Sequence, residues 1–313
     1  MKGWNKIALL FSFLFANGFL FSQNEKLIIG RTTGKLSIKK NLEVRTFGFS
    51  NTLSGQVTLP GSCIDVKEGD NVSIDLWNIS QGNPISMFCN EIEFVQHNEA
   101  KEIMKKKEAI DHMGHGFYSF LATKAGTYLY YSPENYPFNL QAGMFGIIII
   151  RPKEKDSSFV MPCTETLWCS YEIDTKWHTD AIMDVEYDDI NKPIALPDYK
   201  PNYFLINGKI TTEIGGLQSL KNKKETVLLR LVNSGLYLHE ILFPSSAKLQ
   251  LVSGKDTAMI ALPKGNKVNL HPRECLELLV SLENVPEKEQ IIYHFIDPIL
   301  NRISNKKNIP VFY

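Results

Sequence analysis

Histidine and cysteine, the residues that most metal centres and nucleophilic sites require, are scarce in this chain. Of its 313 residues, 7 are histidine and 5 are cysteine. No C-x-x-C pair occurs, which argues against a zinc ribbon or a thioredoxin-like redox site. G-x-S-x-G, H-E-x-x-H and a glycine-rich phosphate loop are also absent from the sequence. The familiar motifs of hydrolases, metalloproteases and nucleotide-binding proteins therefore give no guide to function.

An excess of charge of either sign is also lacking. The 34 lysines and arginines balance the 34 aspartates and glutamates, so the formal net charge is zero. The densest basic segment, Lys105–Lys107, is typical of a solvated loop or helix face. Without a basic stripe interleaved with aromatic residues, we expect no nucleic-acid partner.

Long apolar stretches are rare, and the first one lies within residues 1–22. Two lysines precede an apolar stretch that starts at Ile7 and ends in small and polar residues. This order is typical of a secretory signal peptide. A retained membrane anchor is the alternative, but Asn17 and Gly18 leave the stretch short of the ~20 apolar residues that span a bilayer. We therefore expect a periplasmic or secreted protein without a membrane span after cleavage.

The cysteines leave their pairing open. They are Cys63, Cys89, Cys163, Cys169 and Cys275. Export would permit disulfides, and an odd number leaves at least one thiol unpaired. Cys163 and Cys169 are close enough in the sequence to form a local bridge. The alternative is five buried, unbridged thiols.

Short apolar segments and alternation with a period of two indicate an all-β fold. The clearest predicted strands are Ile64–Val66, Val72–Trp77, Gly146–Ile150, Val227–Val232 and Leu276–Leu282. The polar segment Arg151–Ser158 separates two such series and is typical of a linker. We predict one domain over residues 40–152 and a second over 159–313. Alternation predicts six inward-facing residues in the first: Ile74, Leu76, Tyr128, Tyr130, Ile148 and Ile150.

Several segments match a family pattern in order and spacing. They are LPGSCIDVKEGD (59–70), GTYLYYSPENYPFNLQAGMFG (126–146), NYFLINGK (202–209) and LRLVNSG (229–235). Together they resemble the plastocyanin-like (cupredoxin) domains of multicopper oxidases over about residues 55–297. The resemblance implies two tandem cupredoxin-like Greek-key β-sandwiches, a copper cofactor and oxidoreductase activity.

Most of the copper ligands that this resemblance implies are other residues here. A blue-copper site needs one cysteine thiolate and two histidines, usually with an axial methionine. Where the family has the histidines of its last hairpin, this chain has Tyr131 and Pro133. Ser132 stands near the place of the cysteine and Asn139 near that of a histidine, while Met144 is retained.

The second domain retains two histidines at such positions. His239 matches the first histidine of the family's H-P-x-H-x-H motif, and Leu242 and Pro244 replace the other two. His294 matches the first residue of its H-C-H motif, in which Phe295 replaces the cysteine. On this alignment we expect His239 and His294 to face each other at one end of the domain. Their alternative role is that of ordinary core or surface histidines.

A second pair of histidines, His112 and His115, flanks Met113 in a glycine-rich segment. Their spacing allows weak binding of copper or zinc, and a polar loop before a strand is the alternative.

Two functions follow from these observations. The first is a degenerate multicopper oxidase-like protein that acts by binding an unknown protein or small molecule. The second is a copper-binding oxidoreductase that uses residual sites, with His239, His294, His112 and His115 as candidate ligands. Any copper site would be weak, because a catalytic metal usually has three protein ligands. The ligand count disfavours a complete oxidase or nitrite reductase.

Overall fold

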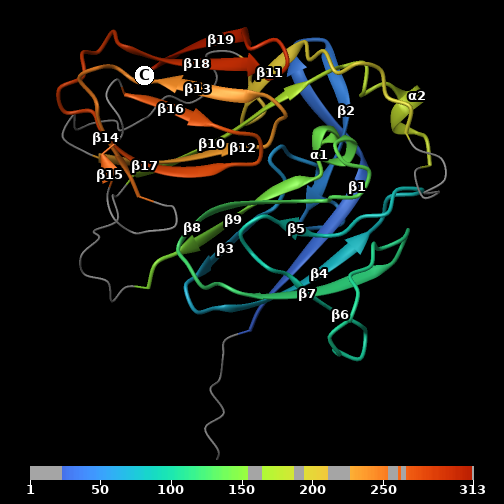
Figure 1. Cartoon of the computed structure of the whole chain (residues 1–313). Coiled ribbons are helices and arrows are strands. Elements are labelled where there is room, and N and C mark those ends of the chain that lie inside the picture. Colours follow the sequence, from blue (N-terminus) through green and yellow to red (C-terminus); the bar gives the residue numbers. More distant parts are fainter. Residues whose placement is uncertain are drawn as a thin grey trace, which may run out of the picture.

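The computed structural model shows two stacked β-sandwiches, one above the other in Figure 1. It describes residues 23–153, 164–186, 194–210, 226–252, 260–261 and 266–311. The predicted signal peptide, Cys163 and most of the predicted linker lie outside these residues. Among the described residues, no helix is long and apolar enough to cross a membrane. The predicted all-β class with two tandem sandwiches is confirmed.

The first sandwich contains a five-stranded and a four-stranded sheet. The larger sheet has the order β2 (Leu42–Ser50), β1 (Gln23–Lys39), β4 (Asn71–Asn78), β7 (His115–Leu121) and β6 (Val95–His97). The smaller has the order β3 (Cys63–Lys67), β9 (Phe145–Arg151), β8 (Gly126–Tyr131) and β5 (Phe88–Cys89). Neighbouring strands are antiparallel except for the β1–β4 and β3–β9 pairs, which are parallel.

The predicted alternation places the expected side chains in the first core. Ile74, Leu76, Tyr130, Ile148 and Ile150 are all buried there, and Tyr128 packs against the same core while partly buried. Between β3 and β4, the φ of Gly69 is 87°, a conformation that favours glycine. The backbone N–H of Asp70 donates to the carbonyl of Lys67 (3.0 Å), which closes a tight turn between the two strands.

Strand β1 lies before residue 40, where the predicted first domain starts, yet it belongs to the same sheet. It pairs in parallel with β4 over Gln23–Gly30 and antiparallel with β2 over Ile29–Lys39. Its consecutive apolar residues Leu27, Ile28 and Ile29 do not alternate with polar ones, so a period-two pattern is not visible there. The predicted boundary at residue 40 therefore omits a strand of this sandwich.

The second sandwich also pairs two sheets. One has the order β11 (Tyr203–Ile206), β10 (Thr164–Ile173), β12 (Thr226–Asn233), β17 (Cys275–Ser281), β14 (Lys248–Leu251) and β15 (Ile260–Ala261). The other has the order β16 (Lys267–Leu270), β13 (Leu238–Leu242), β18 (Gln290–Asp297) and β19 (Arg302–Pro310). Two short helices, α1 (Phe138–Ala142) and α2 (Asp180–Met183), lie between strands.

A continuous apolar layer joins the two sandwiches. Strand β9 is buried on both faces: Ile148 and Ile150 point into the first core, whereas Ile147 and Ile149 point into this layer. The contact layer contains apolar residues from both halves, among them Leu129, Tyr131, Phe145, Tyr171, Ile173, Leu205 and Val232. Burial on both faces explains why β9 has an unbroken apolar run. Figure 1 shows β8 and β9 lying directly below β10, β12 and β17.

An ion-pair network crosses the same junction. The guanidinium of Arg230, only 3% exposed, contacts Glu277 and donates to Glu165 Oε2 (2.9 Å). Glu165 Oε1 also accepts from Arg151 Nη2 (2.8 Å), which in turn donates to Asp65 Oδ2 (2.7 Å). Arg151 and Asp65 belong to the first sandwich and the other three residues to the second. These five residues are called the junction network below, and their ion pairs link the two sandwiches.

Candidate functional site

The residues that stand at the predicted blue-copper positions of the first sandwich lie together in the structure. Ser132, which follows β8, and Asn139 of α1 are fully buried, as is Met144 just before β9. Asn139 Nδ2 donates to Ser132 Oγ (3.4 Å), and the backbone N–H of Ser132 donates to the carbonyl of Met144 (3.0 Å). The β8–β9 hairpin and α1 thus bring the residues at three predicted ligand positions close together.

A fourth member, Asn83, was not predicted. Its side-chain Nδ2 donates to Met144 Sδ (3.7 Å), and its Oδ1 accepts from Asn135 Nδ2 (3.1 Å). It is 3% exposed. The available signal in the sequence was a polar residue in the G-N-P turn, residues 82–84. Asn83, Ser132, Asn139 and Met144 are called the amide cluster below.

The donor set of the amide cluster does not fit a blue-copper ion. It offers a hydroxyl, two carboxamides and a thioether, whereas such a centre needs a thiolate and two imidazoles. Its polar atoms are engaged with one another and with neighbours: Ser132 Oγ donates to Glu134 Oε2 (2.8 Å). Glu134 Oε1 in turn accepts from Ser86 Oγ (2.5 Å). Asn139 Oδ1 has no partner among the described residues. The cluster is thus a nearly satisfied hydrogen-bonded core.

Tyr131, which stands at a predicted histidine position, points away from the amide cluster. Its ring lies in the contact layer, and its hydroxyl accepts from Arg273 Nη1 (3.3 Å) of the second sandwich. The ring of Phe88 packs edge-on against it at 5.5 Å. This position therefore joins the sandwiches through a phenol.

Buried thiols do not replace the missing thiolate. The four described cysteines, Cys63, Cys89, Cys169 and Cys275, are unbridged. Burial raises the pKa of Cys89 and of Cys169 to about 12, so both stay protonated at neutral pH. A protonated, buried thiol is chemically inert. The predicted Cys163–Cys169 bridge involves a residue outside the described part of the chain.

His239 on β13 is the centre of a buried polar network in the second sandwich. Its Nε2 lies 2.7 Å from Glu172 Oε1, and its Nδ1 lies 2.9 Å from Ser170 Oγ. The hydroxyl of Tyr293 lies 2.6 Å from Ser170 Oγ and 3.2 Å from His239 Nδ1. Burial raises the pKa of Tyr293, so its hydroxyl stays protonated and can donate. Both polar atoms of the imidazole are therefore occupied by protein groups.

Serine, histidine and glutamate in this order are the groups of a hydrolytic triad. Here, however, Ser170, Glu172 and His239 are each at most 1% exposed. A substrate could not reach a serine that is sealed in this way, and its oxygen already contacts Tyr293 and the carbonyl of Val232 (3.2 Å). The geometry therefore supports a structural network rather than a nucleophile.

The predicted pairing of His239 with His294 is wrong. In the β13–β18 ladder His239 is opposite Phe295, and His294 is opposite Glu240. Because directly opposed residues share a face and successive residues alternate, the two histidines point to opposite faces of the sheet. His239 packs against Phe295 at a ring separation of 4.5 Å, whereas His294 Nδ1 contacts Glu240 Oε1 at 3.0 Å. They cannot share one metal ion in this fold.

The second predicted pair is also engaged elsewhere. His115 Nδ1 lies 2.7 Å from Asp75 Oδ1, and its ring stacks on Trp77 at 5.1 Å. His112 is exposed in the turn before β7. In the described part of the chain, no three side chains of His, Cys, Asp or Glu gather into a potential metal site. Metal binding by His112 and His115 stays a prediction.

His178 was not predicted as a site residue. It is buried where the second half packs on the first. Its Nδ1 lies 2.6 Å from the carbonyl of Arg45 on β2, so an N–H at Nδ1 donates there. Burial lowers the pKa of His178 to about 4. The histidine is thus neutral at physiological pH. Its sequence context, W-H at residues 177–178, does not distinguish it from a surface residue.

Comparison with known proteins agrees with the fold. Residues 48–155 match the family model described as multicopper oxidase. The blue copper oxidase of Nitrosomonas europaea has the same fold, with a TM-score of 0.68, 18% identity, and coverage of 93% of this chain and 86% of that chain. The copper nitrite reductase from Nitrosomonas europaea has a TM-score of 0.63 and 16% identity, with coverage of 92% of this chain and 93% of that chain. Fet3p, a multicopper oxidase that functions in iron import, has a TM-score of 0.66 and 18% identity, with coverage of 93% of this chain and 53% of that chain. No curated protein matches this sequence.

These findings define the chain as a protein of two cupredoxin-like β-sandwiches. Residues 48–155 match a multicopper oxidase family model, and both halves share the fold of multicopper oxidases, so the resemblance predicted from the sequence is confirmed.

Proposed function

We propose that this chain is an exported multicopper oxidase-like protein that acts by binding a protein or small-molecule partner and does not reduce oxygen. The observation that carries the proposal is the amide cluster. Its four members converge as a ligand set would, but their donor atoms are those of serine, asparagine and methionine. Without a thiolate and imidazoles, this position has no path for the electron transfer that a blue-copper centre provides.

The second sandwich supports the same proposal. His239 stands at a family ligand position, yet Glu172 and Ser170 occupy both of its ring nitrogens. His294 faces the other side of the sheet. Export to the periplasm or out of the cell is proposed on the order of basic, apolar and small residues within 1–22.

A copper-binding oxidoreductase is the alternative function. The exposure of His112 together with that of Met113, which is 54% exposed, favours it, since an imidazole and a thioether are both copper ligands. On this alternative, copper would bind at the turn before β7, outside both sandwich cores.

Restoring the ligand set tests the proposal. The mature wild-type protein, loaded with copper, should lack the intense visible band of a copper–thiolate bond. The triple variant Asn83→His, Ser132→Cys, Asn139→His, with Met144 unchanged, should bind copper and turn blue. The matched control is the double variant Asn83→His, Asn139→His, which retains Ser132 and should stay colourless.

Two results would contradict the proposal. One is a blue band, or oxygen consumption with a phenol or a cuprous salt, from the wild-type protein. The other is a folded triple variant that binds no copper, because the amide cluster would then not occupy a ligand position.

A further inference from the structure

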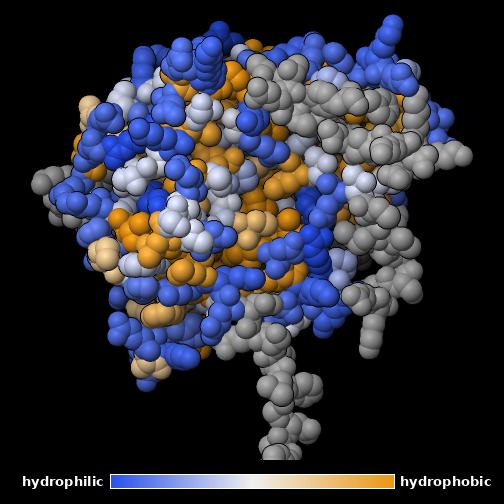
Figure 2. All heavy atoms as spheres, turned by 180° about the vertical axis from the view of Figure 1, so that it is seen from behind, coloured by the Kyte–Doolittle hydropathy of each residue, from blue (hydrophilic) through white to orange (hydrophobic). Residues whose placement is uncertain are grey.

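A hollow of about 730 Å³ lies on the outer face of the five-stranded sheet of the first sandwich, away from the junction with the second. Strands β1, β4 and β7 form its floor, and β6 with the loop after it forms one wall. Figure 2, the view from behind, shows hydrophobic residues over the middle of that face and mostly hydrophilic residues around its edge. The hollow contains neither the amide cluster nor the His239 network.

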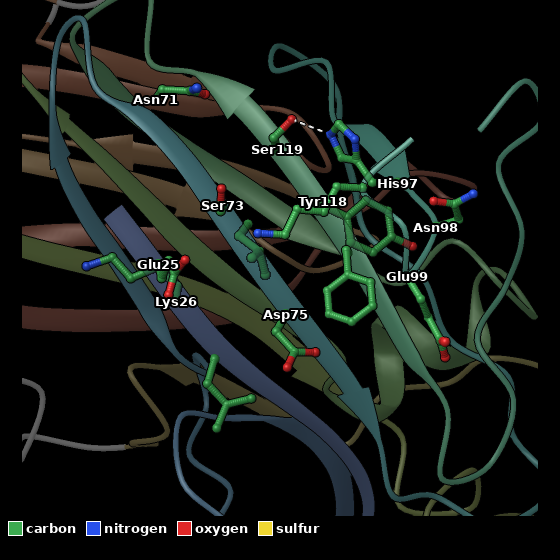
Figure 3. A pocket seen from close by; sticks show the side chains of 14 residues that line it. Glu25, Lys26, Asn71, Ser73, Asp75, His97, Asn98, Glu99, Tyr118 and Ser119 are labelled. Carbon is green, nitrogen blue, oxygen red and sulfur yellow. Dashed lines mark hydrogen bonds between the residues drawn. The ribbon is translucent and has the colours of Figure 1, made fainter. Parts of the chain in front are cut away.

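The strand register brings specific side chains side by side on this floor. Leu27, Asp75, Phe117 and His97 are opposite one another across β1, β4, β7 and β6. In the next row along the strands, Ser73 of β4 is opposite Ser119 of β7. Figure 3 shows His97 and Ser119 joined by a hydrogen bond, 2.7 Å between His97 Nε2 and Ser119 Oγ. The imidazole is thereby fixed above the floor.

Aromatic rings occupy this face where a solvated sheet normally carries polar residues. The ring of His115 stacks on Trp77 at an angle of 17°, and on Phe117 at a centroid distance of 6.2 Å and an angle of 16°. Asp75 holds the imidazole of His115 from the side. The nearly parallel rings pack in a row that ends with Phe117 in the hollow, and this packing holds the Phe117 ring in place. A preformed surface loses little entropy when a ligand binds.

The rim of the hollow offers donors and acceptors with almost balanced charge. Three carboxylates, Glu25, Asp75 and Glu99, face two ammonium groups, Lys26 and Lys101. The carboxamides of Asn71 and Asn98 add neutral hydrogen-bonding groups. Figure 3 shows the labelled charged side chains, Glu25, Lys26, Asp75 and Glu99, spread around the hollow. A strongly charged ligand would meet as much repulsion as attraction here.

We propose that this hollow binds a neutral carbohydrate. A sugar ring has an apolar face of C–H groups that fits a flat aromatic side chain, and a rim of hydroxyls that both donate and accept. Its apolar face would rest on Phe117, while Asp75, His97 and the rim residues would bond its hydroxyls. The inference gives a ligand class to the proposed binding role, and it stands on a surface separate from the family's copper positions.

Calorimetric titration of the mature protein with neutral hexasaccharides of glucose, xylose and N-acetylglucosamine tests this proposal. At least one should bind to the wild type. Phe117→Ala should weaken that binding about tenfold or more, as loss of a central aromatic anchor does. Phe117→Tyr should retain it, because the ring is kept. Phe88→Ala, which removes an exposed phenylalanine on the other sheet (39% exposed), is the control and should bind as the wild type does.

The proposal fails if none of the three sugars binds. It also fails if Phe117→Ala binds as tightly as the wild type, with retained binding by Phe117→Tyr showing that the site is folded. Weakening by Phe88→Ala to the same degree would also overturn it, since binding would then lie elsewhere. The copper experiment above is independent: a blue wild-type protein would refute the proposed function and leave this binding result unchanged.

Discussion

At the scale of single residues, hydrogen-bonding side chains stand where metal ligands would be expected. Asn83 and Asn139 present carboxamides, and Ser132 presents a hydroxyl. These groups form hydrogen bonds within the cluster and to neighbouring residues. His239 shows a second solution, because Glu172 and Ser170 satisfy an imidazole that is retained. Buried polar groups are costly only when they lack partners, so both solutions are compatible with a stable core.

His178 should make the protein less stable in acid. Its folded pKa of about 4 lies below the ordinary value of 6.5, so the unfolded state takes up a proton first. Stability is therefore fully present above about pH 6.5 and is lost as the pH falls towards 4, by up to about 3 kcal/mol. Urea unfolding of the wild type and of His178→Gln at pH 7 and 4.5 measures this. An unchanged pH dependence in the variant would exclude His178 as its source.

The network around His239 should matter for stability rather than for metal binding. Replacing Glu172 with alanine leaves the buried Nε2 of His239 without its hydrogen-bond partner, which should cost about 1–3 kcal/mol. Glu172→Gln should cost less, because an amide oxygen can still accept from His239. His239→Ala should also destabilise the fold but leave copper titration unchanged. Loss of copper binding without loss of stability would instead restore the predicted ligand role of His239.

At the scale of elements, strand positions and inward-facing residues were predictable, whereas strand partners were not. Alternation within one strand identifies Ile74 and Leu76 as inward residues from the sequence alone. Whether His294 shares a face with His239 depends on the register between β13 and β18, which local patterns do not contain. Asn83 was missed for a related reason, because only the fold brings its turn to Met144.

Strand β9 should be sensitive to truncation on both of its faces. Ile148 lies in the first core and Ile147 in the contact layer, and both are fully buried. Each change to alanine should therefore cost about 2–5 kcal/mol. Chemical unfolding of Ile147→Ala and Ile148→Ala measures both free energies, and each variant serves as the control for the other. If Ile147→Ala cost almost nothing, the contact layer would be loosely packed and the two sandwiches would be largely independent.

At the scale of the whole molecule, we expect the junction network and the contact layer to make the two sandwiches unfold as one. Arg230 is the centre of the junction, and Glu165, whose pKa is held below its ordinary value mainly by Arg151, remains ionised beside it. Segments of the second half also reach the first core: Trp177 and Met183 are buried there. Each half thus completes the packing of the other.

Arg230→Ala should destabilise the molecule by about 3–5 kcal/mol, because Glu277 is left buried without its cation. The double variant Arg230→Met, Glu277→Leu should recover most of this loss, since it replaces the pair with apolar groups of similar size. Calorimetry should show one transition in the wild type. Two separate transitions in the wild type would contradict the coupling, as would an Arg230→Ala variant of unchanged stability.

The double burial of β9 also restricts how this chain can evolve. In many multidomain proteins a half can be exchanged for that of a relative, because few contacts cross the boundary. Here a transplanted half would have to match Ile147 and Ile149 in shape and the junction network in charge at the same time. Recombination at the segment between the two sandwiches should therefore produce few viable chimeras, and we expect the two halves to evolve as one module.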